Sequence, residues 1–385
     1  MKSKLSDICF YAKGKVNVSG LTDADYISTE NMLPNKGGIT TASSLPSTIQ
    51  TQAYKKDDVL VSNIRPYFKK IWFADFDGGC SNDVLVFRAK EGTDARFLYY
   101  VLADDAFFDY STATSKGTKM PRGDKTAIMQ YEVPHFDLPI QKKIAGILAD
   151  IDDKIALNSN INKNLEQQTQ ELFKAWFVTF ETFGGKMPSS WSVAKLGDVA
   201  TIKTNSFSPA KNPTVMLEHY SIPAFDEQKY PVFELASNVK SNKYILTDNS
   251  VMISKLNPGT KRVWRPMCIS EFAVSSTEFI IFEANDPTYK DYVFSVIDSP
   301  AFSDWMCAHT TGSTNSRQRT TPSTTLEFQI ALPTQEIVSD FCKIVTPMYD
   351  MIAQNTCENR KLAVFRDSLL PKLMSGELDV SNIEI

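Results

Sequence analysis

Positively charged residues gather in two short stretches in each half of the 385-residue chain. Residues 59–74 hold three cations and no acidic residue, and residues 116–125 hold four cations against one aspartate. In the second half, residues 254–270 and 305–326 carry cations and no acidic residue. Lysine and arginine neutralise phosphates, and arginine, lysine, asparagine, glutamine, serine and threonine read base edges. The recurrence predicts contact with nucleic acid, although a solvated basic loop would explain any single stretch.

The predicted contacts are the basic, amide and hydroxyl residues of these stretches. In the first half they are Ser62, Asn63, Arg65, Lys69, Lys70, Lys116, Thr118, Lys119 and Arg122. In the second half they are Lys255, Asn257, Lys261, Arg262, Thr314, Asn315, Arg317 and Arg319. The loop 117–122 matches 312–317 in place but not in sequence, so two similar scaffolds would recognise two different short sequences. The net charge of −4 is a weak objection, because a whole-chain sum can hide a local basic surface.

Motifs that would support catalysis are missing from the sequence. It has no phosphate-binding G-x-x-x-x-G-K-[ST] loop, no G-x-G-x-x-G after a predicted strand and no G-x-S-x-G elbow. Residues 62–67, SNIRPY, have only a superficial similarity to the N-P-P-Y motif of amino-methyltransferases, since the double proline is absent. We therefore expect a protein that is not an enzyme. A stand-alone enzyme with an unfamiliar site is an alternative.

Cysteine and histidine usage predicts no metal site. The six cysteines form no C-x-x-C pair, and the chain has only three histidines. We expect the cysteines to be reduced packing residues of a cytoplasmic protein. No run approaches the ~18 apolar residues of a membrane span, and the first residues contain no apolar leader.

The elements that would position the basic residues occur twice along the chain. Residues 5–8 (LSDI) return as 196–199 (LGDV), and 59–65 (VLVSNIR) return as 251–257 (VMISKLN). The matches continue in the same order, with 81–87, 138–141 and 155–165 paired with 276–282, 332–335 and 352–362. Such ordered self-similarity indicates a duplicated unit with small loop insertions.

Each repeat begins with a region that we expect to fold as a compact α+β domain, residues 1–136 and 183–331. Short apolar runs such as 84–87 and 279–282, bounded by turn residues, predict strands. Residues 97–110 and 292–305 predict one helical patch in each domain. The architecture expected is two duplicated α/β domains separated by a long antiparallel two-helix coiled coil.

Each repeat ends in a long predicted helix, within residues 137–182 and 332–385. The spacing of apolar residues alternates between three and four, which is a heptad seam. Pro347 is expected to end or kink the first turns of the second helix. Asparagines at equivalent seam positions predict a fixed register, because a buried asparagine needs a polar partner. Solvated positions on loosely packed helices are the alternative reading.

The residues predicted for the helix pair or for docking of partner subunits follow from this seam. They are Leu148, Ile151, Ile155, Asn158, Asn162, Leu165, Leu172, Trp176, Phe177, Ile352, Asn355, Asn359, Leu362 and Leu369. For Trp176 and Phe177 two interpretations stay open, which are packing in the seam and exposure for a partner subunit.

Several longer motifs resemble one known family. The run SLLPKLMSGEL (368–378) is similar to the carboxy-terminal ending of the specificity subunits of type I restriction–modification systems. LPIQKKIAGILADIDDKI (138–155) and ELFKAWF (171–177) resemble the central region of that family, and MPSSW (187–191) followed by LGDV (196–199) resembles the entry to its second target-recognition domain. The resemblance covers essentially the whole chain.

The resemblance implies a non-catalytic DNA-recognition subunit. Two target-recognition domains would each read half of a bipartite site in double-stranded DNA, and two modification subunits that methylate adenine N6 would dock on the helices. Restriction subunits are further expected partners. S-adenosylmethionine, ATP and magnesium would belong to the partners, with no cofactor in this chain. The alternative is a duplicated protein-assembly adaptor without sequence-specific DNA recognition.

Overall fold

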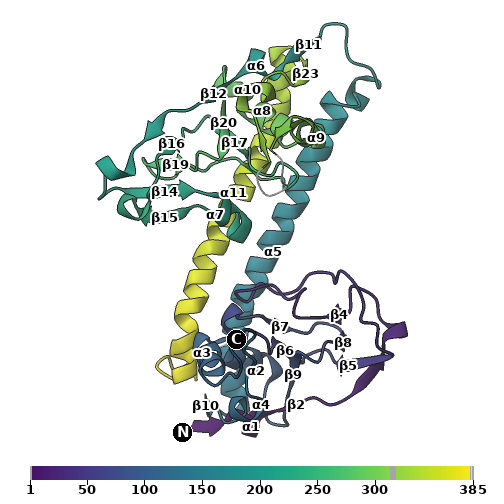
Figure 1. The fold of residues 1–385 in the computed structure, drawn as a ribbon, viewed down its shortest axis with the longest axis vertical. Coiled ribbons are helices and arrows are strands. Elements are labelled where there is room, and N and C mark those ends of the chain that lie inside the picture. The colour runs from purple at the N-terminus through teal and green to yellow at the C-terminus, as the bar shows by residue number, and fades with distance from the viewer. Residues whose placement is uncertain (1, 313–317, 382, 384–385) are drawn as a thin grey trace. The chain divides into compact units, whose positions relative to one another are not determined.

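The computed structural model describes residues 2–312, 318–381 and 383 (Figure 1). The chain forms two compact units: unit 1 is Met1–Ile155 with Lys361–Ile385, and unit 2 is Ala156–Arg360. Each unit contains one α/β domain and a part of each of two long helices. Because equivalent elements follow one another in the same order in both units, the predicted duplication and the α+β fold class are confirmed.

Unit 1 is built, in its described residues, on two four-stranded sheets and one strand pair. The first sheet has the order β2 (Cys9–Tyr11), β9 (Val84–Ala89), β6 (Val59–Ser62) and β7 (Ile71–Phe73). The second has the order β3 (Lys15–Asn17), β5 (Gln50–Tyr54), β8 (Gly78–Cys80) and β4 (Tyr26–Ile27), the last two parallel. β1 (Lys2–Lys4) pairs with β10 (Glu132–Pro134). The helices are α1 (Leu5–Ile8), α2 (Ala95–Ala103), α3 (Asp105–Ala113) and α4 (Lys125–Ile128), with 3-10 turns η1 (Val18–Gly20) and η2 (Pro66–Phe68).

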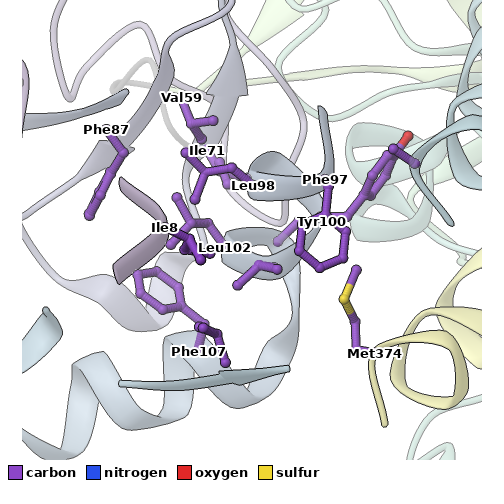
Figure 2. Close-up of a cluster of buried hydrophobic side chains, with 14 of the residues drawn as sticks. Ile8, Val59, Ile71, Phe87, Phe97, Leu98, Tyr100, Leu102, Phe107 and Met374 are labelled. Carbon is purple, nitrogen blue, oxygen red and sulfur yellow. The ribbon is translucent and has the colours of Figure 1, made fainter. Parts of the chain in front are cut away.

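The central strands of unit 1 bury both of their faces. Successive residues of a strand point to opposite sides of its sheet. Val59 of β6 therefore packs in a cluster with α2, while Leu60 packs in a second cluster with the other sheet. Figure 2 shows the first cluster, in which Val59 and Ile71 lie near Leu98 of α2. Met374, from the second long helix, closes the same cluster beside Tyr100.

Unit 2 repeats this architecture with additions. Its first sheet has the order β12 (Ala200–Lys203), β20 (Phe279–Ala284), β17 (Ser250–Ser254) and β18 (Val263–Trp264). Its second has the order β13 (Ser206–Phe207), β16 (Lys243–Ile245), β19 (Ala273–Ser275), β14 (Met216–Tyr220) and β15 (Val232–Leu235). The pairs are β11 (Ser192–Lys195) with β23 (Gln329–Leu332), and β21 (Thr310–Thr311) with β22 (Arg319–Thr320). The helices are α6 (Leu196–Val199), α7 (Ile222–Gln228), α8 (Lys290–Ile297), α9 (Pro300–Ala308) and α10 (Pro322–Thr325), with η3 (Glu181–Phe183), η4 (Pro209–Lys211), η5 (Ala236–Asn238) and η6 (Pro287–Tyr289).

Each predicted helical patch is two helices rather than one. In unit 1, Asp104 ends α2 and caps α3, since its carboxylate accepts a hydrogen bond of 3.0 Å from the backbone N–H of Ala106. In unit 2, Ser299 takes the same place, and Pro300 begins α9. Aspartate and serine compete with helix continuation because their short side chains bond the backbone.

The long helices are α5 (Leu138–Phe177) and α11 (Gln335–Ser375). Within unit 2 they are antiparallel: the side-chain amide of Asn355 donates to Asn162 at 2.8 Å, and that of Asn158 donates to Asn359 at 2.9 Å. The antiparallel pairing is thus confirmed, and the seam asparagines bond one another. The seam residues found buried or half-buried are Leu148, Ile151, Ile155, Asn158, Asn162, Leu165, Leu172, Ile352, Asn355, Asn359, Leu362 and Leu369.

The structure bears on two details that the helix prediction left open. α11 continues through Pro347, so the expected end there is wrong; because Pro347 is exposed, water can bond the carbonyl that the missing N–H leaves free. Trp176 is half-buried and Phe177 is buried, as the interpretation of packing in the seam expects. Phe177 is buried with its ring 4.9 Å from that of Phe341, and Trp176 packs on the same core of unit 2.

Equivalent positions of the helices join each domain in different ways. In unit 1, Asp152 of α5 accepts hydrogen bonds from Tyr100 of α2 at 2.8 Å and from Arg366 of α11 at 2.6 Å. In unit 2, Tyr349 of α11 bonds Ser295 of α8 at 3.0 Å. A charged contact in one unit is therefore replaced by a neutral one in the other.

The cysteines, all of them in the described part of the chain, are free. Cys9, Cys80 and Cys342 are buried, as packing residues should be, whereas Cys307 is exposed on α9. Burial raises the pKa of the Cys9 thiol to about 12, so that it stays protonated. No helix among the described residues is long and apolar enough to cross a membrane.

Candidate nucleic-acid interface

Backbone hydrogen bonds bring the two basic stretches of unit 1 together. Beyond β6, the N–H of Asn63 donates to the carbonyl of Asp83 at 2.8 Å, and the N–H of Arg65 donates to Pro121 at 2.8 Å. Isolated β-bridges join Ile64 to Arg122 and Lys116 to Arg122. The segments 63–65 and 116–122 therefore form one continuous surface, which we name the first basic surface. Thr118 and Lys119 lie exposed on its loop.

Acidic residues pair with cations of the first basic surface and with Lys36 and Lys69. Arg122 donates from Nε and Nη2 to the two carboxylate oxygens of Asp83, at 3.2 and 3.4 Å. We name this pair the first fork. The remaining pairs join Lys69 and Lys36 to Asp105, and Lys116 to Asp124. The stretches that lack acids in sequence are therefore partly compensated in space.

Two lysines share the carboxylate of Asp105. Burial alone would raise the pKa of Asp105, but the hydrogen bonds and charges of Lys36 and Lys69 outweigh it and hold the pKa below its usual value. Lys70 is bound differently, since its ammonium donates to the carbonyl of Thr29 at 2.6 Å. Desolvation lowers the pKa of Lys70.

Two exposed aromatic residues next to the first basic surface were missed by sequence reasoning. Tyr67 and Phe68 form the η2 turn between Arg65 and Lys69, both of which have left-handed backbone angles, with φ of 50° and 51°. Exposed rings beside cations suit stacking on bases or sugars. The signal was available, because the sequence PYFKK interleaves aromatic and basic residues.

Unit 2 builds the same backbone frame. The N–H of Lys255 donates to Glu278 at 2.9 Å and that of Asn257 donates to Gln318 at 2.9 Å, while a bridge joins Leu256 to Arg319. Arg319 donates from Nε and Nη2 to the carboxylate of Glu278, at 3.0 and 3.2 Å, and we name this pair the second fork. These segments, 255–257 and 318–319, form the second basic surface.

The other predicted contact residues of unit 2 differ in their solvent exposure and in their ion pairs. Lys261 is paired with Asp298 at 2.7 Å, and Arg262 is mostly buried in a bidentate pair with Asp226 at 2.6 and 2.9 Å. Thr314, Asn315 and Arg317 lie outside the described residues. The repeat alignment pairs Arg122 with Arg317, and this is wrong by two residues. Arg319 holds the equivalent place, because it bridges Leu256 as Arg122 bridges Ile64.

Both basic surfaces contain residues with a buried polar atom that lacks a partner among the described residues. Asn63 Oδ1 and Arg65 Nε in unit 1, and Asn257 Oδ1 in unit 2, are buried with no hydrogen bond to any described residue. A buried unpaired polar atom costs stability, so its presence at the same place in both units points to a functional constraint. Among the described residues, no group of three or more His, Cys, Asp or Glu side chains could hold a metal ion.

Comparison with known proteins gives a consistent result. Residues 1–167 match the family model described as the type I restriction modification DNA specificity domain. The chain is 26% identical to the type I restriction enzyme MjaIX specificity subunit of Methanocaldococcus jannaschii, over 76% of this chain and 71% of that protein. It is 23% identical to the HindI specificity subunit of Haemophilus influenzae, over 97% of this chain and 98% of that protein.

A solved structure has the same fold. The type I restriction–modification S subunit from M. genitalium superposes with a TM-score of 0.64 at 16% identity, covering 97% of this chain and 96% of that one. Its first 167 residues thus match the type I restriction modification DNA specificity domain, and nearly its full length is similar to a specificity subunit of a type I restriction enzyme.

Proposed function

We propose that the chain reads a bipartite DNA target, with one half-site for each α/β domain. The observation that carries this proposal is the repeated frame: both domains present an arginine in a fork at the same backbone position, on loops that otherwise differ. A common frame with different loops suits two readers of different short sequences. Exposed cations supply the affinity for phosphates, and side chains that reach base edges supply the sequence preference.

The predicted contact residues are unequal candidates. Lys119, Thr118 and Arg122 are exposed on the first basic surface, and Arg319 is exposed on the second. Lys70 and Arg262 are held by other parts of their own units. We therefore expect the first group to touch DNA and the second group to support the surface from below.

The chain acts, in this proposal, without catalysing a reaction of its own. Two modification subunits dock on α5 and α11 and methylate adenine with S-adenosylmethionine, and restriction subunits bring ATP and magnesium. This assembly works on host DNA in the cytoplasm.

A methylation map tests the proposal. The chain is co-expressed with the methyltransferase encoded beside it, and N6-methyladenine is located in the host DNA. A split motif, with two short defined halves around a fixed gap, is the expected result. A continuous motif would mean that only one domain reads. Methylation that is absent although the proteins associate would favour the adaptor alternative, as would DNA affinity that does not fall with ionic strength.

A further inference from the structure

We infer that Asp83 and Glu278 are positioning residues, which hold Arg122 and Arg319 in the orientation that reads a base edge in each half-site. The inference rests on the proposed function and adds to it the residues that determine specificity. Neither acid belongs to the basic stretches of the sequence. Each enters the surface only through the fold, from the turn that leads into β9 or β20.

The forks leave the outer edge of each guanidinium available. Both arginines use Nε and Nη2 for the carboxylate. Among the described residues, none accepts a hydrogen bond from Nη1 of Arg122 or Arg319. A guanidinium has five N–H groups in one plane, so the edge formed by Nη1 and the second N–H of Nη2 stays free. That edge has the two parallel donors that O6 and N7 of guanine accept.

Several hydrogen bonds hold the backbone of the acidic residue in each fork. They fix the position of the carboxylate with which the arginine pairs. In unit 1, Asp83 is held by the hydroxyl of Ser81, which accepts from its N–H at 3.3 Å, and its carbonyl accepts from Asn63 at 2.8 Å. In unit 2, Ser276 and Lys255 make the same two contacts with Glu278, at 3.3 and 2.9 Å. Strand, turn and loop thus meet at the fork in the same way in both units.

A role in stability explains the forks poorly. The side chains of Arg122 and Asp83 are 53% and 37% exposed, and those of Arg319 and Glu278 are 46% and 29% exposed. Ion pairs this open to water contribute little to stability. The pair is nevertheless built twice, with aspartate in one unit and glutamate in the other and with different neighbouring loops. What the two forks share is the placement of a guanidinium at the surface.

A carboxylate beside DNA repels phosphates. Its removal should therefore affect overall DNA binding and sequence discrimination in different ways. Removing Asp83 should leave or strengthen binding to unrelated DNA, because the surface becomes more positive. The same change should weaken discrimination, because the freed guanidinium no longer presents one fixed edge. A residue with only a structural role would lower both together.

The experiment uses the full chain with its modification subunit. Equilibrium binding is measured with duplexes that carry the mapped target, with duplexes in which each base pair is replaced in turn, and with an unrelated duplex. For Asp83→Ala we expect roughly 5- to 100-fold less discrimination at one base pair of one half-site, with binding to the unrelated duplex changed less than about twofold. Glu278→Ala should do the same at the other half-site only. Asp83→Glu should restore part of the preference.

Glu327→Ala provides the matched control. Glu327 forms an exposed pair with Lys195 at 2.5 Å, in the same unit as Glu278 and outside the second basic surface, and its loss should change neither readout. Full discrimination in both Asp83→Ala and Glu278→Ala would overturn the inference, as would a parallel loss of unrelated binding. If the unaltered complex itself had no sequence preference, the proposed function would fail, and the inference with it.

Discussion

The two α/β domains share their frame and differ around it. Ser62 and Ser254 end equivalent strands, and each hydroxyl donates to the carbonyl two residues on, at 3.1 Å in both. Arg65 and Asn257 follow with the same left-handed backbone angle, φ of 50° and 49°, although one is a cation and the other an amide. The fold therefore fixes where a reading residue stands and leaves its identity free to vary.

The two domains differ in the segments that follow the equivalent strands β4 and β14. In unit 1 the chain leaves Ser28 as an irregular loop, whose serine and threonine hydroxyls line an open polar cavity of about 470 Å³. In unit 2 the chain leaves Ser221 as α7, and Phe225 packs on Trp264 with ring centroids 5.2 Å apart. The two domains thus offer different surfaces beside the same fork.

A basic residue at one equivalent position in each domain bonds the segment that follows β4 or β14. Lys70 and Arg262 occupy equivalent places, since the carbonyl of each accepts the N–H of the strand-end serine, at 3.0 and 2.9 Å. Lys70 bonds Thr29, and Arg262 bonds Asp226 of α7. The structures that differ between the two domains are therefore attached to the shared frame at one equivalent position, Lys70 in unit 1 and Arg262 in unit 2.

The largest expected effect comes from exchanging a whole domain. Replacing residues 183–331 with the matching domain of a specificity subunit of different target should change one half of the methylated motif and keep the other. The reason is that the two domains have separate cores. The donor must keep aromatic residues at Trp191 and Tyr292, because Phe177 of α5 packs against both. A methylation map in which both halves change would break the modular interpretation.

The next largest effect should come from buried ion pairs, which also differ between the units. In unit 2, Asp291 is paired with Arg265 at 2.6 Å, and in unit 1, Asp58 is paired with Arg88 at 2.7 Å. Truncating Asp58 leaves Arg88 unpaired, whereas truncating Asp291 leaves the less exposed Arg265 with only its pair to Asp350, at 2.9 Å. The side chain of Arg265 is 15% exposed and that of Arg88 is 32% exposed, so water compensates Arg88 better.

We therefore expect Asp291→Ala to lower the free energy of unfolding by about 3 kcal/mol and Asp58→Ala by about 2 kcal/mol. Amide hydrogen exchange of β17 and β6 reports each unit separately. Each variant should accelerate exchange in its own unit, and equal acceleration of both strands by either variant would contradict the separation of the two cores.

Sequence patterns predicted the repeated elements well and the chemistry of the surfaces only in part. Alternating and continuous apolar runs determine strands such as β9 and β20, and heptad spacing determines α5, because these signals are local. The forks join residues 39 and 41 positions apart, and no local pattern reports such a contact. Asp83 and Glu278 were visible as matching residues of the repeat, but their partners became clear only in three dimensions.

A middle-sized effect is expected at the seam of the helices. Asn158 is buried, and its amide donates to Glu358 at 2.7 Å as well as to Asn359. Asn158→Ala removes both hydrogen bonds and should lower the free energy of unfolding by about 1–3 kcal/mol, measured in urea. As a control, Asn160→Ala changes an exposed asparagine two residues away on the same helix. A loss of equal size in the control would show that helix propensity, not the seam contact, is being measured.

The smallest expected effect on stability is that of the fork variants. It distinguishes a role of the acids in DNA recognition from a role in folding. Because both forks are exposed, Asp83→Ala and Glu278→Ala should each lower the free energy of unfolding by less than about 1 kcal/mol. This is well below the effect of Asp58→Ala, which removes a carboxylate from the same unit as Asp83. Urea unfolding of the three variants gives the contribution of each carboxylate to stability. Binding to the duplexes gives its contribution to sequence discrimination, and the two can be compared. A fork variant that unfolded as readily as Asp58→Ala would make its acid a part of the scaffold, and the equivalence of the two forks would then be one of folding rather than of recognition.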